Sequence, residues 1–232
     1  MKIACIADLH GNWPATQALE KDLIRRKVDR VFCLGDIVGK GPSSDKTFDW
    51  AFANCEVIVG GNWDVYLSKQ IFPRDRFYWD QLGDERLKKL RALPLEHHLT
   101  LSNHLLRMFH GRPITPGLLF PTAPAQELSP YFVKDSLTFQ GIIYGDFHRS
   151  TYRVINQGLV INTGSVGNAM GIPKVFYILL EGVQGAVPAP LDVTVISLPY
   201  NNQQAIQDAE NAPDLPGQEH YIYELRHGIY AR

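Results

Sequence analysis

The first third of the chain alternates short apolar runs with longer stretches in which apolar residues recur at helical spacing. The apolar runs predict buried strands at residues 2–7, 30–35 and 55–60. The helical spacing predicts helices at residues 13–27 and 43–54. Strands without a polar face that alternate with helices are typical of a parallel sheet that is buried on both sides.

The pattern changes towards the middle of the chain. A helix over residues 84–93 is predicted to stop at Pro94, and a hairpin is predicted to turn at Ser102 and Asn103. Residues 112–130 are rich in proline and predict a surface loop or lid. Closely spaced, mostly antiparallel strands and a late helix follow, at residues 141–145, 152–156, 159–164, 174–182, 192–198 and 201–211.

These elements predict an α/β fold in which two mixed β-sheets pack as a sandwich flanked by helices. We expect a single domain over residues 1–232, because no repeat or low-complexity linker divides the chain. Residues 112–130 would be its loop or lid, and residues 200–232 would be a C-terminal extension.

The composition narrows the class of protein. A hydrophobic content of 45% and a charged content of 20% are typical of a soluble globular domain. The net charge of −1 gives no overall field to attract nucleic acid or anionic lipid, so neither an extended nucleic-acid surface nor a membrane partner is expected. The N-terminal apolar run is too short for a signal peptide, and the three cysteines fit small buried side chains in a reducing compartment. We therefore expect a cytoplasmic protein.

Polar side chains gather where the predicted strands end. They are Asp8 and His10 after the first strand, Asp36 after the second, Asn62 and Asp64 after the third, and His110, Asp146 and His148 after later strands. Ligands of open α/β sheets bind at the carboxyl ends of the strands. Carboxylate, imidazole and amide groups from five strand ends can hold two divalent cations that share one carboxylate, an arrangement that suits displacement at phosphorus.

In chain order, these motifs resemble the signature D-x-H, G-D, G-N-H-D/E, H-G and G-H-x-H of the calcineurin-like metallophosphoesterase superfamily. The likeness is greatest to its small prokaryotic phosphodiesterase branch, and it extends over residues 1–182. Segments beyond the motifs carry it as well, at residues 8–20, 35–44 and 161–182. The resemblance implies the four-layer metallophosphoesterase fold and metal-dependent hydrolysis of phosphoesters.

The resemblance also implies a ligand set for each of two ions. The first ion would take Asp8, His10, Asp36 and His148, and the second would share Asp36 and add Asn62, His110 and Asp146. Asp146 replaces a histidine of the family, and it would bind the second ion either directly or weakly through water. Because a carboxylate makes this site harder, manganese is the expected metal, with iron, zinc, magnesium and nickel as alternatives.

Trp63 is the second departure from the family pattern, because the family has a histidine near the leaving group at this position. Indole has no titratable proton near neutral pH, but it offers an N–H donor and a flat face. Trp63 would therefore either stack on a nucleobase or aryl group or fill the space as packing. Asp64 would hydrogen-bond the backbone around Asn62. The expected catalytic residues are therefore Asp36, Asn62, Trp63 and Asp64.

Three basic residues are candidates for contact with substrate. Arg112 and Arg149 each follow a proposed ligand histidine, and a guanidinium can bind phosphate through two hydrogen bonds. Lys40 replaces a tyrosine of the family and could add positive charge at the rim of the site. A solvated surface position is the alternative for all three.

The sequence therefore predicts a metallophosphoesterase that acts through a hydroxide activated between two metal ions. A phosphodiesterase is expected ahead of a phosphatase that hydrolyses monoesters. Small phosphate esters or nucleotides are the expected substrates, and assembly into a homo-oligomer is left open. The alternative is a degenerate family member that binds metal or nucleotide without turnover, or that serves as a protein-interaction scaffold. A pure scaffold has no reason to keep six ligand residues together, namely Asp8, His10, Asp36, Asn62, His110 and His148.

Overall fold

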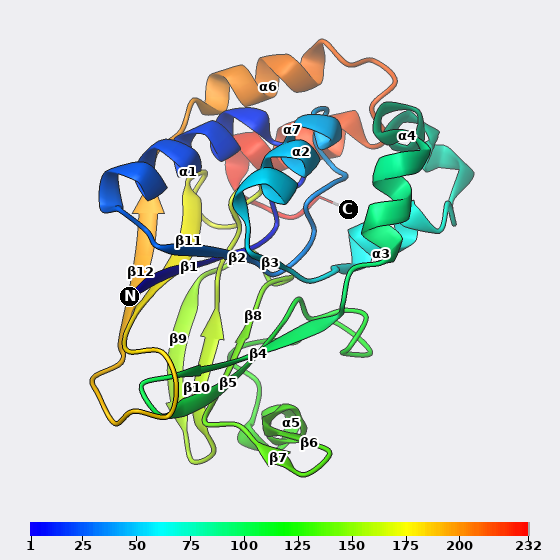
Figure 1. The fold of residues 1–232 in the computed structure, drawn as a ribbon. Helices are drawn as coiled ribbons and strands as arrows, with labels where there is room; N and C mark the ends of the chain where they lie inside the picture. The colour runs from blue at the N-terminus through cyan, green and yellow to red at the C-terminus, as the bar shows by residue number, and fades with distance from the viewer. Residues whose placement is uncertain (232) are drawn as a thin grey trace.

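Two five-stranded mixed sheets pack face to face in the computed structural model, which describes residues 1–231 (Figure 1). The first sheet has the order β12-β11-β1-β2-β3, with β1 Lys2–Ile6, β2 Arg30–Cys33, β3 Val57–Ile58, β11 Val175–Glu181 and β12 Asp192–Leu198. The second has the order β4-β5-β8-β10-β9, with β4 Glu96–Leu101, β5 His104–Phe109, β8 Gly141–Tyr144, β9 Thr151–Ile155 and β10 Gly158–Asn162. The predicted pair of mixed sheets is confirmed.

Strand direction follows the prediction in the first sheet and departs from it in the second. β1, β2 and β3 are parallel, as the alternation of strands and helices predicts. The hairpins β4–β5, β9–β10 and β11–β12 are antiparallel, and the first turns at Ser102 and Asn103, which both have positive φ. However, β8 is parallel to both of its neighbours, β5 and β10, so the expectation of mostly antiparallel late strands is wrong at the centre of this sheet.

The strands are apolar on both faces because each face meets a separate core. Ile3 and Cys5 of β1 point into the core between the two sheets. Ala4 and Ile6 alternate with them and point into the core beneath the helices. After Lys2, which is partly exposed, every residue of β1 is buried and apolar, because neither face of the strand meets solvent.

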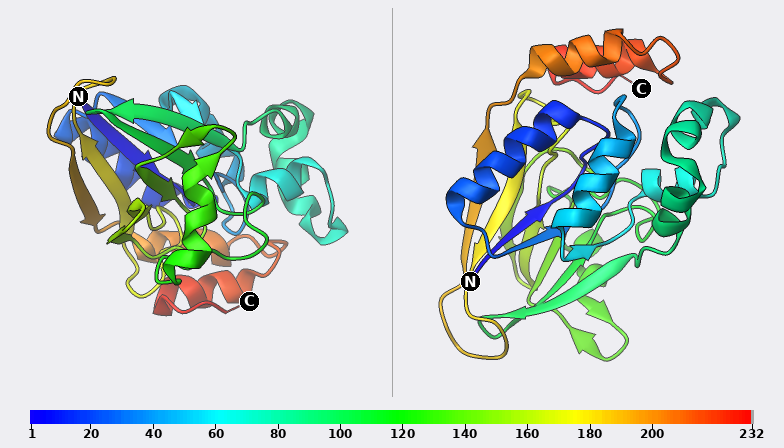
Figure 2. Two further views of the ribbon diagram at one scale, coloured as in Figure 1. Left: turned by 90° about the horizontal axis from the view of Figure 1, so that it is seen from below. Right: turned by 45° about the horizontal axis from the view of Figure 1, so that its top comes forward.

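Helices cover the outer face of the first sheet (Figures 1 and 2). They are α1 Trp13–Arg26, α2 Ser44–Asn54, α6 Asn202–Glu210 and α7 Gln218–His227, while α3 Asn62–Ser68, the 3-10 turn Pro73–Asp75 and α4 Arg76–Arg91 follow β3. The sequence missed α3 and α7 and began α4 too late. α4 contains Gly83 with φ of 66°, and this break in the helix hides the periodicity of its first half. The strand predicted at residues 55–60 is also shorter in the structure, at Val57–Ile58.

The proline-rich segment packs against the outer face of the second sheet. It contains α5 Ala125–Leu128 and the 3-10 turn Ser129–Phe132, and the small hairpin of β6 Val133–Lys134 and β7 Leu137–Thr138 follows it. Leu128 and Phe132 belong to the same buried apolar cluster as Ile142 and Tyr144 of β8. The segment is therefore a covering layer with apolar contacts of its own. Its role as a lid, and the division of residues 1–232 into one domain with a C-terminal extension, stay predictions.

Within residues 1–231, none of the helices is both long and apolar enough to cross a lipid bilayer. The expected cytoplasmic location stays a prediction.

Candidate metal centre and substrate pocket

The proposed ligands lie at the carboxyl ends of β1, β2, β5 and β8 and at the start of α3. Asp8 and His10 follow β1, and Asp36 follows β2. His110 comes directly after β5, and Asp146 lies two residues beyond β8. Because β1 and β2 run parallel, as do β5 and β8, all of these strand ends open at the same edge of the sandwich.

Most of the proposed ligands have an unusual backbone. Positive φ is uncommon for residues other than glycine and clusters at functional sites, where surrounding contacts hold the strain. Five of the seven have it, namely Asp8 (58°), His10 (47°), Asp36 (51°), Asp146 (66°) and His148 (62°). Hydrogen bonds between neighbouring loops fix these turns: the Asp8 N–H donates to Gly35 O at 2.9 Å, and the His10 N–H donates to Asp36 O at 3.1 Å.

The side chains form two groups that share Asp8. In the first, His148 Nε2 lies 3.2 Å and His10 Nε2 lies 3.6 Å from Asp8 Oδ1. In the second, His110 Nε2 lies 3.3 Å from Asp36 Oδ2 and 3.8 Å from Asp8 Oδ1. Asp36 Oδ2 also lies 3.6 Å from His10 Nε2, so this oxygen is situated between the two groups.

Three buried polar atoms that lack a hydrogen-bond partner within residues 1–231 indicate that this centre suits metal ions. Asp8 Oδ1, Asn62 Oδ1 and His110 Nε2 are buried, and none of them has a hydrogen-bond partner within residues 1–231. Buried polar atoms normally have partners, and a carboxylate, an amide oxygen and an imidazole nitrogen are all metal ligands. The donor set and its orphaned atoms therefore suit divalent cations.

The histidine rings are oriented by main-chain carbonyls. His110 Nδ1–H donates to Leu34 O at 2.6 Å, and His148 Nδ1–H donates to Asn168 O at 2.6 Å. Since a carbonyl can only accept, Nε2 is the ring atom that faces the carboxylates in both residues. This is the usual support for a metal-binding histidine.

The carboxylates concentrate negative charge in a buried place. Burial raises the pKa of Asp36, and the charges of Asp8 and Asp146 act in the same direction, while His110 opposes them. Burial would lower the pKa of His110, but Asp36 and Asp8 outweigh it and hold that pKa well above its ordinary value. Charges that attract a proton this strongly also attract a metal cation.

Asp64 holds the loop of Asp36. Its carboxylate accepts hydrogen bonds from the backbone N–H groups of Asp36 at 2.8 Å, Ile37 at 3.0 Å and Gly61 at 2.9 Å. Burial, followed by the charge of Asp36, raises the pKa of Asp64 to about 7. Asp64 is fully buried and is not part of the pocket wall, so it acts through Asp36 as a positioning residue. Its hydrogen bonds extend beyond the backbone around Asn62 to the backbone of Asp36 and Ile37.

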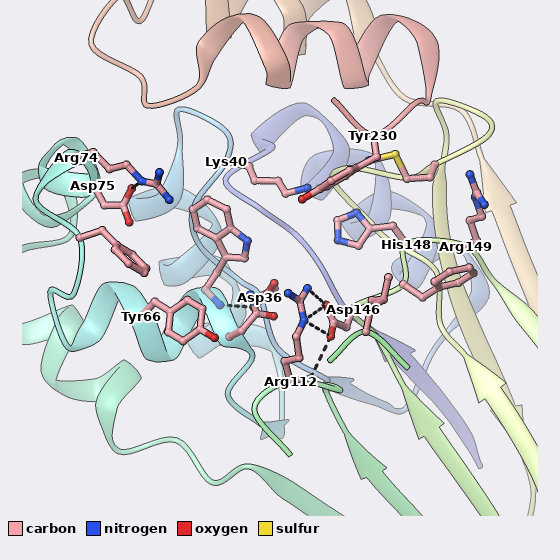
Figure 3. Close-up of a pocket in the computed structure, with 16 residues that line it drawn as sticks. Asp36, Lys40, Tyr66, Arg74, Asp75, Arg112, Asp146, His148, Arg149 and Tyr230 are labelled. Atoms are coloured by element: carbon pink, nitrogen blue, oxygen red, sulfur yellow. Dashed lines mark hydrogen bonds and ion pairs between the residues drawn. The ribbon is translucent and has the colours of Figure 1, made fainter. Parts of the chain in front are cut away.

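Asp146 is paired with Arg112 (Figure 3). The Arg112 Nε donates to Asp146 Oδ2 at 2.9 Å, its Nη2 donates to Oδ1, and its backbone N–H donates to Oδ2 at 3.1 Å. Burial would raise the pKa of Asp146, but the hydrogen bonds from Arg112 outweigh it and lower the pKa. Asp146 Oδ1 lies 4.0 Å from His110 Nε2, so the carboxylate stands beside the second group with a guanidinium already bound to it.

Trp63 both packs and lines the pocket. Its indole lies edge-on to His10, with ring centroids 5.9 Å apart, and edge-on to the fully buried Tyr78 at 6.2 Å. A Cβ on Gly39 would come within 2.2 Å of the indole Cε3, so glycine at this position leaves space for the ring. The Trp63 backbone N–H donates to Asp36 Oδ1 at 2.8 Å, which leaves Oδ2 for the metal centre.

A pocket of about 600 Å³ opens above these residues (Figure 3). Four of the proposed ligands, Asp36, Asn62, Asp146 and His148, are part of its wall. Most of the rest is aromatic and cationic, with Trp63, Tyr66, Phe72, Phe147 and Tyr230 beside Lys40, Arg74, Arg112 and Arg149, and it is completed by Asp75, Leu118 and Met170. Anions with planar substituents suit such a lining.

A match to a protein-family model shows to which class of protein this centre belongs. The calcineurin-like phosphoesterase superfamily domain matches residues 1–184. The chain belongs to this superfamily. It is a phosphoesterase, and its family supports metal-dependent hydrolysis of phosphoesters.

Known relatives of this phosphoesterase share its architecture over almost the whole chain. A metallophosphoesterase of Sphaerobacter thermophilus is 25% identical with a TM-score of 0.77, covering 99% of this chain and 100% of that one. A hypothetical protein of Pyrococcus horikoshii is 22% identical with a TM-score of 0.78, covering 99% of each chain. An uncharacterized protein of Methanocaldococcus jannaschii is 27% identical over 205 residues, which are 77% of this chain and 82% of the relative. These likenesses confirm the predicted fold class.

The phosphoesterase pocket also contains residues that no sequence motif marks. Tyr66 comes from α3, Phe72 and Arg74 come from the segment between α3 and α4, and Tyr230 follows α7. These positions lie in no motif, and only the fold brings them to the metal centre. Lys40 differs from expectation in another way, because its side chain is 5% exposed and therefore lies inside the wall instead of at the rim.

Proposed function

We propose that this phosphoesterase hydrolyses phosphodiesters and uses two divalent ions that share Asp36. The observation that supports this most directly is the position of Asp36 Oδ2, 3.6 Å from His10 Nε2 and 3.3 Å from His110 Nε2. An oxygen between two imidazole nitrogens is suited to bridge two ions. The pocket above it is large enough for a substrate with two ester substituents.

The chain would divide its ligands between the two ions. Asp8, His10 and His148 would hold the first ion, and Asn62, His110 and Asp146 the second. Asp36 Oδ2, which lies near both His10 and His110, would belong to both ions, and Asp8 lies within reach of the second group as well. When bound, two such ions supply an activated water and neutralise charge on the phosphoryl oxygens. Asp64 keeps the Asp36 loop in place through its three backbone hydrogen bonds. The main-chain carbonyls keep Nε2 of His110 and His148 turned towards the carboxylates that would share the ions.

Other residues would bind and orient the ester. Arg112 is 38% exposed at its side chain and lines the pocket, so its guanidinium can reach a phosphoryl oxygen while it remains paired with Asp146. Arg149 is exposed on the same wall and lies over the Phe147 ring at 5.8 Å. Trp63 offers no proton to a leaving group. The site therefore suits esters whose leaving groups depart without a strong general acid.

A substrate panel tests this function. We expect Mn²⁺-dependent hydrolysis of bis(4-nitrophenyl) phosphate and of dinucleoside phosphates, abolished by EDTA and restored by Mn²⁺. An alkyl monoester should be at least about 100-fold slower in kcat/KM, because a positioned general acid contributes typically 10²–10⁴-fold and Trp63 cannot replace it. The phosphodiesterase assignment fails if monoesters are hydrolysed as fast as the diesters at every Mn²⁺ concentration.

We also expect Mn²⁺ to support a higher kcat/KM than Zn²⁺, because Asp146 replaces an imidazole by a harder carboxylate. Asp146→His should shift the ratio of the two activities towards Zn²⁺ by about tenfold or more, in the range by which changes around a metal site alter affinity. Zn²⁺ and Mn²⁺ dissociation constants, measured by competition with a chelating dye, give a readout independent of turnover. Asp84→His, at an exposed position of α4, is the matched control. An unchanged metal preference in Asp146→His would remove Asp146 from the ligand set.

A further inference from the structure

The tail that follows α7, residues 228–231, lies beside the metal centre. Tyr230 lies in the wall of the pocket, and the residue is 61% exposed (Figure 3). Gly228 ends α7 with φ of 63°, and its carbonyl accepts a hydrogen bond from the Gly171 N–H at 2.7 Å. A Cβ on Gly228 would approach the Gly171 backbone to 3.0 Å, so the tail lies directly on the loop that carries Met170 into the pocket.

A buried carboxylate joins this tail to the floor of the pocket. Glu224 of α7 is 1% exposed, and its Oε1 accepts a hydrogen bond from the Ala231 N–H at 3.2 Å. Its Oε2 accepts one from Lys40 Nζ at 3.4 Å. Lys40 Nζ also donates to Asn168 Oδ1 at 2.7 Å, and Asn168 O is the carbonyl that orients His148. A series of hydrogen bonds therefore connects Ala231 of the tail, through Glu224, Lys40 and Asn168, to the proposed metal ligand His148.

The tail aromatic ring and the lysine lie together at the pocket. Lys40 Nζ is 5.5 Å from the centroid of the Tyr230 ring, and Figure 3 shows both side chains above His148. Trp63 belongs to the wall that follows β3, so the two rings come from opposite ends of the sequence. A phosphodiester differs from a monoester by its second substituent, and a second aromatic wall gives that substituent a surface on which to stack.

We propose that Tyr230 forms a subsite for a planar aromatic group on the second ester arm of the substrate, the arm that remains on phosphorus when the leaving group departs. Glu224 is the positioning residue that holds the tail and Lys40 in register. The cation beside the ring suits an arm that is electron-rich or carries a further negative charge. This inference rests on the proposed phosphodiesterase activity and adds a basis for selecting among diesters.

The test compares three esters with one leaving group. They are bis(4-nitrophenyl) phosphate, 4-nitrophenyl methyl phosphate and 4-nitrophenyl phosphate, so that the second arm is an aryl group, a methyl group or absent. Tyr230→Ala should raise KM for the bis-aryl ester by about 5- to 150-fold, the range of stacking on an aromatic side chain, with kcat retained. The methyl ester and the monoester should change less than about twofold. Tyr230→Phe should behave as the unmodified chain on all three.

The matched control is Tyr223→Ala, because Tyr223 is an exposed tyrosine of α7 whose ring lies tilted against His227 outside the pocket. Glu224→Gln should reproduce part of the Tyr230→Ala effect, and its melting temperature shows whether the fold is intact. Equal KM changes for the bis-aryl and methyl esters in Tyr230→Ala would overturn the subsite. Failure of the unmodified chain to hydrolyse either diester would instead overturn the proposed phosphodiesterase activity, so the two failures are distinguishable.

Discussion

Replacing Asp36 by asparagine is expected to reduce kcat/KM for diesters by about 10³-fold. The Trp63 backbone N–H would keep the amide oxygen at the position of Oδ1, so an NH2 group that cannot bind metal would replace the carboxylate oxygen between His10 and His110, and the negative charge would be lost. Lewis-acid stabilisation by metal ions contributes several kcal/mol to a transition state, and each 1.36 kcal/mol is a factor of ten in rate. Metal content should fall from two ions per chain in the unmodified protein to one or none.

Both quantities are accessible in the same preparation. Steady-state kinetics at saturating Mn²⁺ give the rate, and plasma mass spectrometry of the dialysed protein gives the metal content. Asp84→Asn, on the exposed side of α4, controls for the loss of one carboxylate elsewhere. A single ion per chain in unmodified protein saturated with metal would contradict the shared-carboxylate centre, even if Asp36→Asn were inactive.

Trp63→Ala is expected to raise KM for nucleotide and aryl diesters by about 5- to 150-fold, from roughly 1–3 kcal/mol of lost stacking. Small alkyl phosphate esters should change much less, because they have no planar group to lose contact with the indole. Trp63→His should instead favour monoesters relative to diesters, since an imidazole can protonate a poor leaving group. The measurement is kcat/KM for an aryl diester, a nucleotide diester and an alkyl monoester in each variant.

Stability has to be measured in parallel, because the indole also packs against Gly39 and Tyr78. Removal of a buried tryptophan side chain costs about 3–5 kcal/mol of unfolding free energy. Trp79→Ala is the matched control, since Trp79 is a partly buried tryptophan of α4 that packs on the same core outside the metal pocket. If Trp63→Ala lowered activity on all three substrates alike and destabilised the fold as Trp79→Ala does, Trp63 would be a packing residue only.

The sequence predicted the elements whose signals are local. Apolar runs marked β1 and β2, and the polar residues that follow them marked Asp8, His10 and Asp36. These residues could be found because the end of a strand and the start of a loop are adjacent along the chain. The ordered motifs then identified the family, which the match to residues 1–184 confirms.

Features that depend on distant contacts were not predictable in this way. Gly-Gly-Asn-Trp resembles a turn, yet α3 begins at Asn62 because Asp64 accepts hydrogen bonds from both Gly61 and Asp36. The parallel pairing of β8 with β5 and β10 depends on crossovers that no local period records. The pairing of Arg112 with Asp146 is equally invisible in the sequence, because it joins residues from two different strand ends.

The order in which the chain leaves the ribosome bears on when this centre can first bind metal. Asp8, His10 and Asp36 are made early, but His148 completes the first group only after both sheets have been started. The charge of the Lys40 ammonium is balanced later still, because its buried partner Glu224 lies in α7. At translation rates of about 5–20 residues per second, several seconds separate the two events. In the nascent phosphoesterase, the side chains of the first group are thus all synthesised before the wall that we propose selects its substrate.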